Sequence, residues 1–183
     1  MSTNATTQQS DELSEIDLTI LTAVNKGFRY VADILDYCGP QLDQEGQGWD
    51  CSTYMLRIDR LIDLDYLRRN GNRFNGFLEI TLTERGRSAV PPLSEEETSL
   101  LGEYGISIEA LNVLKAVIEY EEEHGTFPST NQLIERTEFS DSCYQCTALF
   151  NRIVDAGLAV ERGILRYKIE PTDEGRKLVA NRE

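Results

Sequence analysis

A helix-and-hairpin pattern that occurs twice constrains the fold of this chain more than any other feature. The first copy begins in the stretch from Cys51 to Arg69. Within it, Tyr54, Ile58 and Leu61 are spaced four and three residues apart, which places them on one face of a helix. Tyr66 then opens an extended segment. The pattern predicts one helix that runs directly into a strand.

A turn rich in arginine, asparagine and glycine follows this strand. It contains Arg68, Arg69 and Arg73, and after it residues 77–82 (FLEITL) alternate between apolar and polar side chains. Such alternation is typical of a half-buried strand. The first copy is therefore predicted to be a helix followed by a β-hairpin with a basic tip.

The second copy lies about 92 residues further along the chain. Arg60–Asp63 (RLID) matches Arg152–Asp155 (RIVD), and after the hairpin Thr83–Arg87 (TERGR) matches Thr172–Arg176 (TDEGR). Internal repetition of this kind indicates a duplicated structural unit. We expect two small domains at 13–90 and 107–183, joined by a linker at 91–106 that contains a short helix.

The helical periodicity extends the prediction to the rest of both copies. Helices are expected at 13–26, 28–38, 51–65, 83–90, 108–124, 131–137, 142–156 and 172–181. Gly39 and Pro40 are expected to end the second of these helices. The loop from there to Asp50 is longer than the 3 or 4 residues of a tight helix-turn-helix.

Composition sets the broad class of the protein. The apolar fraction of 40% predicts a folded chain, and no apolar run is long enough to cross a membrane. Residues 1–12 are polar and lack the features of a signal peptide, so we expect them to be disordered and the protein to be cytoplasmic. The net charge is −14, with 32 acidic residues against 18 lysines and arginines.

These motifs resemble the winged-helix regulators of the MarR and PadR type from archaea and bacteria. The resemblance rests on the arginine-rich helix and strand at 57–69 and on Leu82–Arg87 (LTERGR). The acidic, lysine-poor composition is similar to that of proteins from halophilic archaea. The resemblance implies a mostly helical α+β chain with two tandem winged-helix domains. It also implies a sequence-specific transcription regulator that binds double-stranded DNA as a homodimer. We expect no cofactor.

Candidate DNA contacts lie on the two presumed recognition helices and hairpins. Arginine at a guanine edge is the commonest base-specific contact, and hydroxyl groups at a helix start suit phosphates. The first copy supplies Ser52, Thr53, Arg57, Arg60, Arg68, Arg69 and Arg73, and the second supplies Tyr144, Gln145, Arg152, Arg162, Arg166 and Lys168.

Two alternatives compete with this interpretation. The arginines could instead form surface ion pairs, as the spacing of Arg60 and Asp63 allows. The second copy has Ala148 and Leu149 where a DNA reader would carry polar side chains, which suggests burial against a partner or against the other domain. The overall acidity also favours a protein-interaction subunit of a transcription or chromosome-organising complex. We expect the first domain to read DNA and the second to be at least partly an interaction surface.

The four cysteines have a plainer interpretation. Cys143 and Cys146 form a CxxC pair without a second pair nearby, and His124 is the only histidine. A structural zinc site takes four ligands, so Cys146 is expected to be a small apolar core residue. A redox- or metal-responsive regulator built on this pair is the weaker alternative. The sequence contains no phosphate-binding glycine loop and no nucleophile elbow, and no enzyme is expected.

Overall fold

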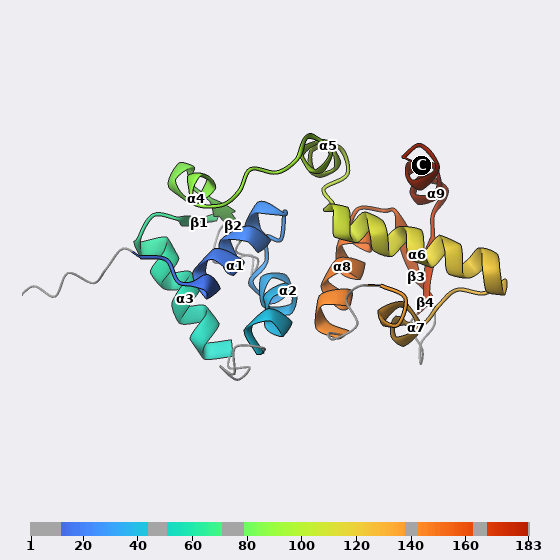
Figure 1. The fold of residues 1–183 in the computed structure, drawn as a ribbon, viewed down its shortest axis with the longest axis horizontal. Coiled ribbons are helices and arrows are strands. Elements are labelled where there is room, and N and C mark those ends of the chain that lie inside the picture. Colours follow the sequence, from blue (N-terminus) through green and yellow to red (C-terminus); the bar gives the residue numbers. More distant parts are fainter. Residues whose placement is uncertain (1–11, 44–50, 71–78, 138–142, 163–167, 183) are drawn as a thin grey trace, which may run out of the picture.

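The computed structural model describes residues 12–43, 51–70, 79–137, 143–162 and 168–182, and it is mostly helical with two small antiparallel sheets (Figure 1). The N-terminal half consists of α1 (Glu15–Asn25), α2 (Val31–Asp43), α3 (Cys51–Asp63), β1 (Leu67–Asn70), β2 (Glu79–Leu82) and α4 (Glu84–Ser88). Helix α5 (Glu95–Glu103) follows, and the C-terminal half consists of α6 (Ile108–His124), α7 (Thr130–Ile134), α8 (Cys143–Asp155), β3 (Ala159–Arg162), β4 (Lys168–Pro171) and α9 (Asp173–Ala180).

The two halves have the same order of helices and strands. Strands β1 and β2 are antiparallel with Leu67 opposite Leu82, and β3 and β4 are antiparallel with Ala159 opposite Pro171. In each half the segment before the second helix also touches the second strand. The amide of Ile80 donates to the carbonyl of Arg29 at 2.7 Å in the first half. The second half has an antiparallel bridge at the corresponding place, between residues 129 and 168.

The third helix of each half, α3 or α8, is followed by a turn that leads into the first strand of the hairpin, β1 or β3. This turn has the same structure in both halves. Asp65 has a φ of 60°, and Gly157, its equivalent, has a φ of 71°. The hydroxyl of Thr83 caps α4 by accepting from the amide of Gly86 at 3.1 Å, as the hydroxyl of Thr172 caps α9. This turn is a local structure that each copy of the sequence encodes by itself.

Glycine is required at the start of the last helix of each half because the backbone passes very close to it. A Cβ atom at Gly86 would lie 2.1 Å from the carbonyl oxygen of Tyr66. A Cβ atom at Gly175 would lie 2.1 Å from the carbonyl oxygen of Leu158. The glycine of the repeated TxxGR motif is therefore explained by close packing of the helix on the preceding turn.

The sequence places most helices correctly. Helix α6 has the predicted bounds and ends at Gly125, whose φ of 64° provides a left-handed C-cap. Helix α5 begins with the capping box formed by Ser94 and Glu97. Helix α7 is shorter than predicted and ends at Ile134. The predicted disordered N-terminus and most of the loop before α3 lie outside the described residues.

The prediction for α2 is wrong at both of its ends. The helix begins at Val31 instead of Phe28, and the carbonyl of Arg29 before it accepts from the amide of Ile80 in β2. It also continues through Gly39 and Pro40 to Asp43. The tertiary packing of α2 outweighs the local preference of proline and glycine to end a helix.

The two halves are joined by the packing of α2 against α8, which is the most extensive contact between any two helices of the described chain. Figure 1 shows α2 turned toward the C-terminal half, whereas α3 lies on the far side of α1. The buried apolar side chains form one cluster that includes Ile34 of α2, Ile20 of α1, and Leu114 and Leu149 of the C-terminal half. None of the described helices is long and apolar enough to cross a membrane.

Candidate nucleic-acid interface

Helix α3 packs its predicted apolar face onto α1. Tyr54, Ile58 and Leu61 are buried, as their spacing indicated, and Tyr66 is buried in the turn that leads to β1. Burial of these four side chains holds α3 at a defined position beside the hairpin. Only residues on the other faces of α3 are therefore available to contact a binding partner.

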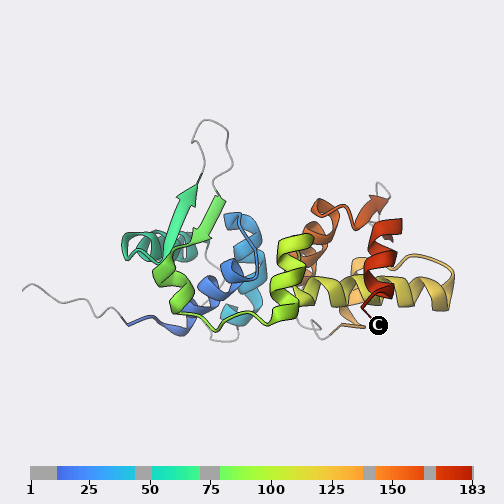
Figure 2. The ribbon, with the colours of Figure 1, turned by 90° about the horizontal axis from the view of Figure 1, so that it is seen from above.

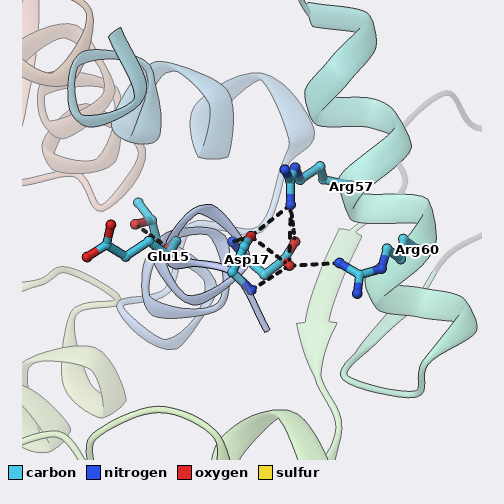
Figure 3. Close-up of polar contacts among 6 residues, drawn as sticks. Glu15, Asp17, Arg57 and Arg60 are labelled. Atoms are coloured by element: carbon cyan, nitrogen blue, oxygen red, sulfur yellow. Dashed lines mark hydrogen bonds and ion pairs between the residues drawn. The ribbon is translucent and has the colours of Figure 1, made fainter. Parts of the chain in front are cut away.

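Two arginines of α3 point toward α1 and bind one buried carboxylate (Figure 3). Arg57 Nη1 donates to Asp17 Oδ1 at 3.3 Å and to the hydroxyl of Ser14 at 2.7 Å. Arg60 Nη1 donates to Asp17 Oδ2 at 2.9 Å. The side chain of Asp17 is completely buried. The same carboxylate accepts from the amide of Ser14 at 3.0 Å and so completes the capping box of α1.

These contacts favour the charged form of Asp17. Burial by itself would raise the pKa of this carboxyl, but hydrogen bonds from Ser14 and the positive charge of Arg57 outweigh burial and hold the pKa below its ordinary value. Asp17 is thus a charged group that anchors α3 to the start of α1. Arg57 and Arg60 are its counterions, with side chains 27% and 33% exposed.

The outward surface of α3 carries a different set of residues from the one expected. Leu56 is 69% exposed and Met55 is 38% exposed, and on the same helix Asp59 is half-buried and Asp63 is exposed. Arg57 and Arg60 do form ion pairs, but their partner is the buried Asp17 and not Asp63, the surface partner that the sequence spacing allowed for Arg60.

The first hairpin presents arginines next to this outward surface. Arg68 is exposed on β1, whereas Arg69 forms an ion pair with Asp59 of α3. Arg73 lies outside the described residues. Ser52 and Thr53 lie in the first turn of α3, but their side chains fall outside the described part of the chain.

The corresponding positions of the second half are buried. Ala148 and Leu149 are 0% exposed, whereas the equivalent Leu56 and Arg57 are 69% and 27% exposed. Helix α8 packs on α6 and α7 of its own half and also on α2 of the N-terminal half, which gives it neighbours that α3 lacks. The expectation that Leu149 is buried is confirmed.

Arg152 lies at the junction of the halves. Its Nη2 donates to the carbonyl of Gly105, and its guanidinium lies 6.0 Å from the ring centre of Phe28. Burial, and next the positive charge of Arg29, lower the pKa of Arg152. The structure therefore places Arg152 apart from Arg57 and Arg60, although the sequence repeat aligns Arg152 with Arg60.

The remaining residues predicted for the second half lie on its hairpin and at the start of α8. Arg162 is exposed and donates to Glu170 at 2.7 Å, and Lys168 donates to the hydroxyl of Thr126 at 2.9 Å. Gln145 is half-buried. The side chain of Tyr144 and the whole of Arg166 lie outside the described residues.

Sequence reasoning missed Asp17 and the arginines that flank the first hairpin. The spacing of Ser14 and Asp17 is a capping-box signal that predicts the helix start, but it does not reveal the partners on α3. Arg85 lies 4.4 Å from the ring centre of Tyr66 and donates to the carbonyl of Leu64. Arg87, in the same repeated motif, is exposed.

The cysteines and acidic residues suggest no metal centre in the described part of the chain. No group of three or more histidine, cysteine or carboxylate side chains is placed there to hold a metal ion. Cys146 is buried, in agreement with its predicted place in the core, and Cys38 is buried as well. Burial raises the pKa of the Cys38 thiol to about 12.

The comparisons with known proteins give no relative. No protein-family model matches the chain, and no curated protein matches its sequence.

Proposed function

We propose that this chain is a tandem winged-helix DNA-binding regulator of the MarR and PadR type that contacts duplex DNA through α3 and the first hairpin. Support comes from the order of elements in each half, in which three helices are followed by an antiparallel hairpin and a last helix. The major groove admits one α-helix, and a neighbouring hairpin can then reach the phosphate backbone.

The observation that carries the proposal is the difference in exposure between the two equivalent helices. Leu56 of α3 is 69% exposed, whereas Ala148 at the matching position of α8 is fully buried. A helix must be accessible along one whole side to enter a groove. On this basis the N-terminal half binds DNA and the C-terminal half is the structural and interaction unit.

The burial of Asp17 changes which arginines are assigned to DNA. Arg57 and Arg60 serve first to neutralise Asp17, and their remaining N–H groups are only partly exposed. Arg68 is the exposed cation of β1, and Arg69 becomes a phosphate ligand when it leaves Asp59. The carboxylate of Asp59 repels phosphate, so a protein of this kind gains little from counterion release and depends on shape and base contacts.

The test is selection of binding sites from random duplex DNA in molar potassium chloride. Wild type is compared with Arg68→Ala/Arg69→Ala and with Arg162→Ala as a matched control on the second hairpin. We expect an enriched motif for wild type and for the control, and its loss in the double variant. Arg57→Ala is unsuitable as the main variant, because it also leaves Asp17 partly uncompensated.

A single substitution sharpens this test. Asp59→Asn removes a negative charge from the outward side of α3 and releases Arg69, so duplex affinity should rise by about three- to tenfold at moderate salt. Unchanged affinity in Asp59→Asn, together with no enriched motif for folded wild type, would contradict DNA binding through α3.

A protein-interaction role is the second candidate, and one observation favours it. Leu56 and Met55, which are neighbours in sequence on α3, both expose apolar surface. A second copy of the chain is the partner that fits the expected homodimer. Sedimentation equilibrium of wild type and Leu56→Lys tests this role: a dimer that dissociates in the variant supports it, and monomers in both samples contradict it. The same variant should bind DNA at least as tightly as wild type if α3 enters a groove.

A further inference from the structure

A small cavity lined by arginines lies where the two halves meet. Its volume is about 220 Å³, and it is bordered by the end of α1 and the turn after it, by β2 and α4, by α5 and its end, and by α8. Figures 1 and 2 show α5 at the boundary between the halves. Its polar lining includes Arg29, Arg87 and Arg152, together with Asn25 and Thr81, and no carboxylate is among the described lining residues.

The hydrogen bonds of two of these arginines do not neutralise their charge. Arg87 Nη2 donates to the carbonyl of Leu82 at 3.2 Å, and Arg152 Nη2 donates to the carbonyl of Gly105. Each guanidinium carries five N–H groups, so one bond to a neutral oxygen uses little of its capacity. The cavity therefore keeps a positive charge in a chain whose net charge is −14.

The third arginine is paired only weakly. Arg29 Nη1 lies 3.8 Å from Glu79 Oε2, and the side chains are 56% and 38% exposed. An ion pair at this distance and exposure contributes little to stability. The positive charge of Arg29 instead acts on Arg152, where it adds to the effect of burial in lowering the pKa of that guanidinium.

The acidic residues near Arg152 border a separate groove. Asp33 and Asp155 attract Arg152, but they line a larger groove between α2 and α8 together with Tyr30 and Phe150. They are not among the residues of the arginine cavity. Arg152 thus lies between an acidic groove and a basic cavity, and only the cavity lacks a counterion among its described lining residues.

We propose that this cavity binds the phosphate group of a small phosphorylated ligand. Guanidinium groups match phosphate oxygens in pairs, and arginines from three separate segments suit a tetrahedral dianion better than a planar carboxylate. Pockets for drug-sized ligands have volumes of about 300–1,000 Å³, so this cavity suits a smaller group. The proposal does not depend on DNA binding by α3.

Phosphate in this cavity would connect the halves. Arg29 and Arg87 belong to the N-terminal half and Arg152 to the C-terminal half. A ligand that binds only the folded arrangement stabilises it by mass action. The cavity is therefore an effector site that sets how firmly α8 and the first hairpin are held together.

The experiment measures the thermal midpoint of unfolding as inorganic phosphate replaces potassium chloride at constant ionic strength. Phosphate also stabilises proteins in general by exclusion from their surface, and this effect does not saturate at low concentration. Wild type is compared with Arg29→Gln and Arg87→Gln, both at exposed positions, and with Arg162→Gln as a control outside the cavity. We expect a saturable rise for wild type and control, with phosphate affinity about tenfold weaker in each cavity variant.

Isothermal titration with phosphate and with a short duplex separates the two sources of phosphate. A saturable signal for inorganic phosphate that both cavity variants weaken supports the proposal. A signal that is absent in wild type, or equal in all four proteins, overturns it. Weaker duplex binding by Arg29→Gln and Arg87→Gln, without any response to inorganic phosphate, also overturns it and assigns the arginines to the DNA backbone.

Discussion

Asp17 and Arg57 are 40 residues apart in sequence, yet Arg57 Nη1 lies 3.3 Å from Asp17 Oδ1 and joins α3 to the first turn of α1. The carboxylate is completely buried and also binds Arg60. Because a buried charge without a partner destabilises the folded state, the main role of this contact is to stabilise the fold. Ionised Asp17 therefore adds to the burial of Ile58 and Leu61 in holding α3 against α1.

Asp17→Asn should lower the free energy of unfolding by about 2–3 kcal/mol, because it leaves two half-buried guanidinium groups without their counterion. The measurement is urea denaturation at neutral pH, followed by circular dichroism. Asp63→Asn, at an exposed position at the end of α3, is the control and should change the free energy of unfolding by less than about 0.5 kcal/mol. Equal stability of Asp17→Asn and wild type would contradict the anchoring role.

Acid should remove the same contribution. The pKa of Asp17 is lower in the folded protein than in the unfolded chain, so its stabilising effect is fully present above the unfolded value of about 3.9. It is lost as the pH falls through the folded pKa. We expect the stability difference between wild type and Asp17→Asn to be constant from pH 7 to about pH 5 and to shrink below about pH 4. A difference that grows toward low pH would reverse this conclusion.

Gly86→Ala and Gly175→Ala should each destabilise the protein by about 3 kcal/mol or more, since a Cβ atom at either position would lie 2.1 Å from a carbonyl oxygen. Gly102→Ala is the matched control: its site in α5 has open space, so the substitution should stabilise the protein by about 0.5–1 kcal/mol. Thermal unfolding of the three variants checks this. Tolerance of alanine at Gly86 would show that α4 is not packed closely on the turn.

Lys26 and Glu109 form an ion pair between the end of α1 and the start of α6, with side chains 20% and 21% exposed. Glu109 Oε2 is buried and has no hydrogen-bond partner among the described residues. Lys26→Met should therefore cost about 2–3 kcal/mol, whereas Lys26→Met/Glu109→Met should cost less than about 1 kcal/mol. A double-mutant cycle by denaturant unfolding gives the coupling energy. Additive effects would show that the pair does not link the halves.

Cys38 and Cys146 should resist thiol reagents in the native protein. Both are buried, and burial raises the pKa of the Cys38 thiol to about 12, which keeps it in the unreactive thiol form. Titration with a disulfide reagent in native and denatured samples checks this, with Cys38→Ala and Cys146→Ala as references. The native counts should be the same in wild type and in both variants. A lower count in Cys146→Ala would revive the redox-responsive alternative.

Patterns within the repeat predicted the local elements of both halves. The spacing of Tyr54, Ile58 and Leu61 identified the buried face of α3, and the aligned Cys146 is buried on α8. The TxxGR motif marked the start of α4 and of α9. These predictions succeed because helix periodicity and hydroxyl caps act between residues three or four positions apart. The close contacts of Gly86 and Gly175 with the preceding turns are visible only in the structure.

The candidate site was predicted less well, for a physical reason that Arg57 and Leu149 illustrate. Arg57 lies four residues before Leu61 of α3, and Leu149 lies four residues before Ile153 of α8. Helical periodicity does not predict which other segment of the chain packs against this position. In the first half Asp17 of α1 receives Arg57, and in the second half α2 covers α8. Asp17 lies 34 residues before the first residue of α3, and α2 ends 100 residues before α8 begins.

The sequence by itself determined most of the helices of the repeated unit and their caps, because helical periodicity and capping depend on side chains a few residues apart. Only the tertiary structure decided that α2 packs on α8 of the other half, that Arg57 and Arg60 bind Asp17, and that Arg152 meets Arg29 beside a cavity. These contacts join segments far apart in the chain. Their formation depends on how much apolar surface each packing buries and on which charges then need a partner, and no local pattern records that balance.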